Sequence, residues 1–104
     1  MLLPMSLRHI ILSRNRGQPV TTSEGVYFLM MRGGQEIECL VTRAALSELA
    51  ERDLEISQLE MVYYRHCLLL AEAANRVFLV MGRFKVLTVG PEDVWELMSS
   101  GAWS

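Results

Sequence analysis

The chain has 104 residues, of which 51% are hydrophobic and 21% charged, and its formal net charge at pH 7 is −2. This length and composition fit one small globular domain and exclude intrinsic disorder. No apolar run approaches the roughly 20 residues that span a bilayer, so we expect a soluble protein that does not cross a membrane.

The N-terminal segment is apolar but interrupted. Pro4, Arg8 and His9 break its apolar run, and no basic residues precede it, so it does not fit a signal peptide. We therefore expect a cytoplasmic protein. It forms a single domain over residues 1–104, in which residues 1–4 are either disordered or precede a native start at Met5.

Residues 7–12 are rich in Ile and Leu and predict a short strand. The following segment, 13–25, contains several turn and breaker residues and predicts a linker.

The clearest local signal lies in residues 26–41, where two extended runs flank Gly33-Gly34. This dipeptide supplies the positive φ angles that a two-residue hairpin turn needs. The turn fixes the register and puts one side of the hairpin on the core, through the pairs Val26–Val41, Phe28–Cys39 and Met30–Ile37.

The opposite side of the hairpin is half apolar, which is unusual for a face exposed to solvent. It carries Tyr27, Leu29, Met31 and Leu40 beside Glu36 and Glu38. Another element of the chain or a partner must cover this side, and the four apolar residues are our candidate interface.

Thr42 is the predicted N-cap of a short helix over residues 43–52, which buries Leu46, Leu49 and Ala50. Ser57 to Glu60 then has the spacing of a capping box, ahead of a long helix that we expect to end near residue 79.

The long helix is apolar around most of its circumference, so we expect it to be buried on more than one side, as the central helix of the fold. One apolar face holds Leu59, Val62, Tyr63, His66, Leu70, Ala73 and Val77. A second apolar flank holds Met61, Tyr64 and Leu68.

Residues 77–89 allow two interpretations. We favour the end of the long helix with Gly82 as its stop, followed by a strand over 84–89; the alternative is a second hairpin that begins in the β-prone stretch 77–81. Pro91 then opens a final helix with acidic residues in its first turn.

The apolar face of this final helix holds Val94, Trp95, Leu97 and Met98. The tail, 99–104, contains Trp103, which we expect to be packed or at an interface. Together the elements predict an α+β fold. A small antiparallel sheet of the N-terminal strand, the Gly-Gly hairpin and the late strand packs against one long and two shorter helices.

Four stretches of the sequence carry a resemblance to a known family. They are residues 25–28, the strand-to-helix passage 37–46, the helical stretch 73–78, and the close from Lys85 to Val94. Over roughly residues 5–95 the chain resembles a small bacterial domain-of-unknown-function family, number fourteen eighty-eight. The resemblance implies a small α+β fold and a cytoplasmic bacterial protein, and it implies no assigned activity.

Chemistry-bearing residues are few. His66 beside Tyr63 and Tyr64 could serve proton transfer, but neither a nucleophile nor an orienting carboxylate accompanies it, which favours a histidine of the core. Cys39 and Cys67 have no metal-ligand spacing and lie on apolar stretches, as reduced cysteines do in a cytosolic protein. We therefore predict no catalytic, metal or cofactor site.

Two functional hypotheses remain beside a small enzyme built around His66. The first is a non-enzymatic accessory or interaction module that binds another protein or itself, as a homodimer. The alternative is a nucleic-acid-associated regulator that uses an arginine patch of Arg8, Arg14, Arg16 and Arg32. The pI of about 5.6 and the single lysine count against this alternative.

Overall fold

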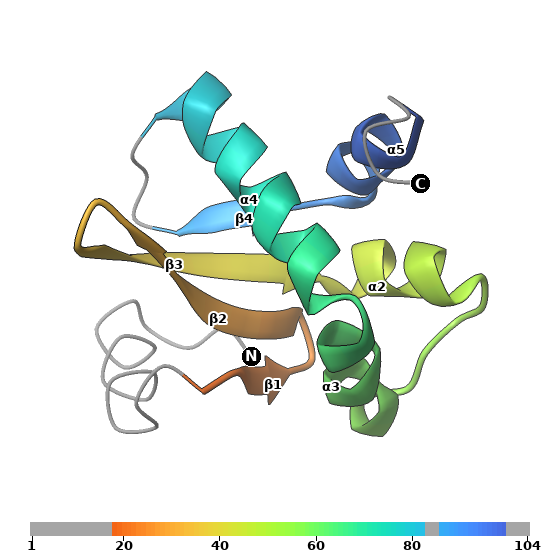
Figure 1. The fold of residues 1–104 in the computed structure, drawn as a ribbon. Helices are drawn as coiled ribbons and strands as arrows, with labels where there is room; N and C mark the ends of the chain where they lie inside the picture. The colour runs from red at the N-terminus through yellow and green to blue at the C-terminus, as the bar shows by residue number, and fades with distance from the viewer. Residues whose placement is uncertain (1–17, 83–85, 100–104) are drawn as a thin grey trace.

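The computed structural model describes residues 18–82 and 86–99. They form one four-stranded sheet in the order β1-β2-β3-β4, with α3 and α4 lying across one face (Figure 1). The elements in chain order are β1 (Val20–Thr22), β2 (Gly25–Arg32), β3 (Gln35–Thr42), α2 (Arg43–Ala50), α3 (Ile56–Arg65), α4 (Cys67–Met81), β4 (Leu87–Val89) and α5 (Pro91–Ser99). The predicted α+β class is confirmed.

The predicted hairpin is β2 and β3, with the predicted register. Met30 pairs with Ile37, Phe28 with Cys39, and Val26 with Val41. Gly33 and Gly34 have φ angles of 59° and 79°. Both angles lie in the left-handed region that glycine adopts without steric cost, which is why this dipeptide sets the turn.

The segment 13–25 is not purely a linker, because its described part contains β1. This strand pairs antiparallel with β2, and Val20 lies opposite Tyr27. The Thr22 hydroxyl accepts a hydrogen bond from the Glu24 backbone N–H at 3.2 Å, which tightens the turn into β2. The strand predicted over 7–12 lies outside the described residues.

The sheet is mixed, which corrects the prediction that it is antiparallel. β4 pairs with β3 in parallel, and Leu40 lies opposite Thr88. Among the described residues, α2, α3 and α4 lie between these two strands in the chain. Since a parallel pair needs such a long crossover, the helical segment between them makes the parallel arrangement possible.

The long helix predicted to end near residue 79 is two helices, because the chain changes direction at His66 (Figure 1). His66 has φ −117° and ψ 21°, outside the helical range. Its backbone N–H donates to Tyr63 and Val62, and its carbonyl accepts from Leu70. The break therefore keeps the backbone hydrogen bonds of His66 while turning α4 onto the sheet.

The N-terminal cap of α3 lies two residues earlier than predicted. Glu55 is the N-cap, and its backbone N–H donates to the Gln58 side chain at 3.0 Å. Leu54 and Leu59, on either side of this cap, are both buried in the main core. Their positions are those of a hydrophobic staple, which fixes how the chain enters the helix.

The other helix ends lie at or near the positions that the sequence predicts. The Thr42 hydroxyl accepts from the Ala45 N–H at 3.1 Å, as predicted for an N-cap, although α2 ends at Ala50 rather than at residue 52. α4 extends to Met81 with Gly82 as its C-cap, so the stretch 77–81 is the end of a helix and not a hairpin strand. The prediction that Trp103 is packed or at an interface falls outside the described residues.

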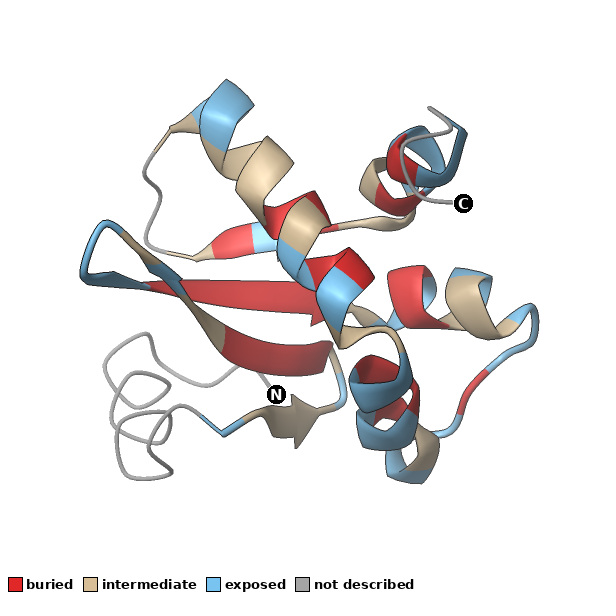
Figure 2. Cartoon of the chain, viewed as in Figure 1, coloured by how far each residue is buried: buried red, intermediate tan, exposed pale blue. Residues whose placement is uncertain are grey.

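The main core lies between the sheet and the helices (Figure 2). The predicted core side of the hairpin lies in it, with Met30 partly buried. From the helices it takes Leu46, Leu59, Leu70 and Leu97, all fully buried. The face of the helices that points away from the sheet is therefore left to solvent or to a partner.

Candidate interaction surface

The side of the hairpin predicted as an interface is largely covered within one chain. Tyr27 and Leu40 are only 2% and 8% exposed, and Val20, Leu29 and Val86 pack against them in a second small cluster. The Tyr27 hydroxyl also donates to the Glu24 carboxylate at 2.8 Å. For these two residues the covering element belongs to the chain itself.

Leu29 is half-buried, and Met31 alone of the four candidate interface residues is prominently exposed. Glu36 is exposed, whereas Glu38 is buried. An interface on this side thus stays a prediction, and Met31 is the residue through which it can be tested.

The second apolar flank of the helices is exposed, which corrects the expectation that it is buried. Met61, Tyr64 and Leu68 are 51%, 52% and 74% exposed, and Leu79 is 64% exposed. Met61 and Tyr64, three residues apart, lie on one side of α3. Leu68 and Leu79 lie on one side of α4, since eleven residues bring a helix back to nearly the same direction. We call these four residues the outer helical face.

An arrangement of two layers explains this exposure. The sheet lies on one side of α3 and α4 (Figure 1), and both helices carry buried as well as exposed residues (Figure 2). A hydropathy pattern shows that a helix has two apolar sides, but it does not show how many layers pack against it.

Tyr64 is attached to the core through its neighbours. Its ring makes an edge-on contact with the Tyr63 ring, with the centroids 5.4 Å apart, and Tyr63 contacts Phe28 of β2 at 5.2 Å. Aromatic pairs at these distances are favourable and orient the rings. The exposed ring of Tyr64 is therefore held in place by Tyr63, which packs against the core.

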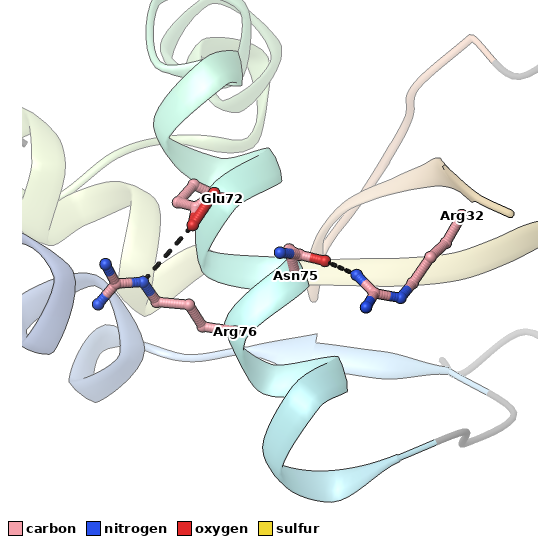
Figure 3. A network of polar contacts seen from close by, with 4 residues as sticks. All are labelled: Arg32, Glu72, Asn75 and Arg76. Carbon is pink, nitrogen blue, oxygen red and sulfur yellow. Dashed lines mark hydrogen bonds and ion pairs between the residues drawn. The ribbon is translucent and has the colours of Figure 1, made fainter.

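Charges of both signs border the outer helical face. Glu60 and Arg65 are exposed on α3, and Glu72 forms an ion pair with Arg76 at 3.6 Å on α4 (Figure 3). A surface that carries both signs beside an apolar stripe can be complementary to a second copy of itself.

Of the predicted arginine patch, only Arg32 lies in the described residues. Its guanidinium donates a hydrogen bond to the Asn75 side chain (Figure 3). It also lies 4.7 Å from the centre of the Phe78 ring. Arg32 thus joins the end of β2 to α4. Arg8, Arg14 and Arg16 lie outside the described residues.

We predict that Arg32→Ala lowers the free energy of unfolding by about 1–2 kcal/mol, since it removes a charged hydrogen bond and a cation–π contact. The matched control is Arg76→Ala on α4. It removes one partly exposed ion pair, with Glu72, and should cost about 0.5 kcal/mol or less. Urea unfolding of both variants measures the difference, and equal losses would contradict a structural role for Arg32.

Three of the chemistry-bearing residues lie in the described part of the chain, in the core or at its edge. His66 is half-buried at the break between α3 and α4 rather than on a continuous buried stripe. Burial, and then the nearby Glu38 charge, raise the pKa of Cys39 to about 12. Burial chiefly, and then Cys67, Tyr64 and Cys39, raise the pKa of Tyr63 to about 12. Both groups are protonated near neutral pH, so neither supplies a nucleophile or a base there.

Two further properties hold for residues 18–82 and 86–99. No three His, Cys, Asp or Glu side chains come together in a group that could hold a metal ion. In this same part of the chain, every helix is too short or too polar to cross a bilayer.

No protein-family model, curated protein or solved structure matches this chain. The resemblance drawn from the sequence therefore stays a prediction.

Proposed function

We propose that this domain is a non-enzymatic interaction module that forms a homodimer through the outer helical face. The observation that carries the proposal is the exposure of four large apolar side chains, Met61 and Tyr64 on α3 and Leu68 and Leu79 on α4. Exposed apolar side chains are common singly, but a contiguous group of them marks an interaction site.

The composition of this face supports a second copy as the partner. In a dimer with two-fold symmetry the same patch lies on both sides, so its apolar centre meets an apolar centre. The acidic residues that border the face can then pair with basic residues of the second copy. Tyr64 is an exposed aromatic residue held in place by Tyr63, and residues of this type often contribute most of the binding energy.

Two observations support the remaining parts of the proposal. Cys39 and Cys67 are both free, which fits a reducing compartment such as the cytoplasm. The high pKa values of Cys39 and Tyr63 fit a structural rather than a catalytic use of these groups.

The test is the molar mass in solution, measured by light scattering behind size exclusion across an about tenfold range of concentration. We expect the parent chain to have about twice the monomer mass of 11.8 kDa. Leu68→Lys should return it to the monomer mass, because a lysine at the centre of the interface would leave a buried charge unpaired. Circular dichroism should show unchanged secondary structure, because Leu68 is exposed in the monomer.

Met31→Lys is the matched control, since it adds the same charge at a similarly exposed residue on the other side of the sheet. It should leave the dimer intact. A monomeric parent would overturn the proposal. Dissociation by Met31→Lys together with a dimeric Leu68→Lys variant would move the interface to the outer side of the hairpin.

A further inference from the structure

A second feature, separate from the outer helical face, is a groove of about 640 Å³ between the end of α2 and α5. One wall is apolar and comes from α5, where Trp95 and Met98 are both 52% exposed. The other wall comes from the end of α2 and the loop after it, and it carries Glu48, Glu51 and Asp53. The predicted apolar face of the last helix is therefore buried at Val94 and Leu97 and exposed at Trp95 and Met98.

The indole of Trp95 is oriented by the acidic wall. Its Nε1–H donates to the Glu48 carboxylate at 3.0 Å, which joins the two helices across the groove. Because this hydrogen bond uses the only polar group of the indole, the ring offers the groove its apolar and π surface.

The electrostatics of the groove are negative. Three carboxylates line it against one guanidinium, that of Arg52. They lie at the C-terminal end of α2, whose last turn contains no basic residue. A helix C-terminus carries a partial negative charge, so a cation is favoured at this position, where the chain supplies mainly acids.

We infer that this groove binds a short basic segment of a partner protein, with an arginine or lysine side chain against Trp95 and its charge facing Glu51 and Asp53. Charge complementarity selects a cation, and the indole surface favours it further through a cation–π contact. The exposed Met98 beside it accepts an apolar neighbour of that cation, since methionine adapts its shape to what it contacts.

Fluorescence anisotropy of a labelled hexapeptide of alternating arginine and leucine tests this inference on the full chain. We expect saturable binding that weakens as the salt concentration rises. A hexapeptide of alternating glutamate and leucine should not bind. Trp95→Ala should weaken binding by about tenfold, as expected for a central aromatic contact.

Glu51→Gln is the second variant, because it removes one charge without touching the indole, and it should weaken binding severalfold. Its control is Glu36→Gln, which removes one exposed carboxylate from β3, outside the groove, and should leave the affinity unchanged. Leu68→Lys should also leave it unchanged, so that loss of the dimer and loss of peptide binding are separate results.

Three results would overturn the inference. The first is the absence of binding by the arginine peptide, and the second is equal affinity of the parent, Trp95→Ala and Glu51→Gln. The third is a change in the molar mass of the peptide-free protein on Trp95→Ala, since the groove would then be a contact between copies of this chain.

Discussion

Gly25→Ala is expected to destabilise the domain by several kcal/mol, enough to leave much of the chain unfolded without denaturant. Gly25 has a φ angle of 151°. A Cβ atom there would overlap the carbonyl oxygen of Val41 and come within 3.0 Å of the Thr42 Cα. Both neighbours are backbone, so no side chain can turn aside to relieve the contact.

The backbone around Gly25 is also fixed by its pairing. Gly25 lies opposite Thr42 at the start of β2, and the Arg43 N–H donates to the Glu24 carbonyl at 2.9 Å. Moving the strands apart would break this pairing at the point where β3 passes into α2. Urea unfolding followed by circular dichroism measures the loss.

Gly33→Ala is the matched control for this prediction. Gly33 also has a positive φ, 59°, but a Cβ atom there would meet nothing within 4 Å. Its cost should be about 1–2 kcal/mol, the ordinary penalty of an alanine in the left-handed region. If both substitutions cost the same, the close approach of β2 to β3 at Gly25 is not what requires the glycine.

Raising the pH from about 9 to about 12 is expected to lower the free energy of unfolding steeply. Burial raises the pKa of Cys39 from 9.0 to about 12 and that of Tyr63 from 10.0 to about 12. Below pH 9 both groups are protonated in the folded and the unfolded chain, so their contribution is fully present. As the pH rises through this window the unfolded chain loses these protons first, and the contribution is lost.

The loss from Cys39 alone is on the order of a few kcal/mol, since each unit of pKa difference corresponds to about 1.4 kcal/mol. Urea unfolding across the pH range measures it. Cys39→Val should flatten the dependence above pH 9, and Tyr63→Phe should flatten it above pH 10. If both variants keep the slope of the parent chain, these two residues do not govern alkaline unfolding.

The parts of the fold that the sequence predicted well are those set by local chemistry. The hairpin register follows from Gly33-Gly34 and the alternation on either side, and the start of α2 follows from Thr42. The break at His66 has no such signal, because neither proline nor glycine occurs there. The apolar face of the predicted long helix continues in phase across His66, so the pattern suits one helix or two.

The interaction surface was harder to predict because exposure depends on which elements lie side by side. Alternation along the hairpin correctly separated Tyr27 and Leu40 from the main core. It did not show that Val20 and Val86 pack beside them. The apolar pattern predicts a buried flank at Met61 and Tyr64, because an apolar residue is buried on average. The pattern does not show that the sheet lies on one side of α3 only.

The parallel pairing of β3 with β4 also has a consequence for synthesis of the protein. During translation the hairpin and all of α2, α3 and α4 leave the ribosome before β4 does. Until β4 arrives, the edge of β3 offers unpaired N–H and C=O groups along an apolar strand, and such an edge can pair with a neighbouring nascent chain. Once made, β4 covers this edge from Cys39 to Val41, so the last described strand protects the sheet as well as completing it.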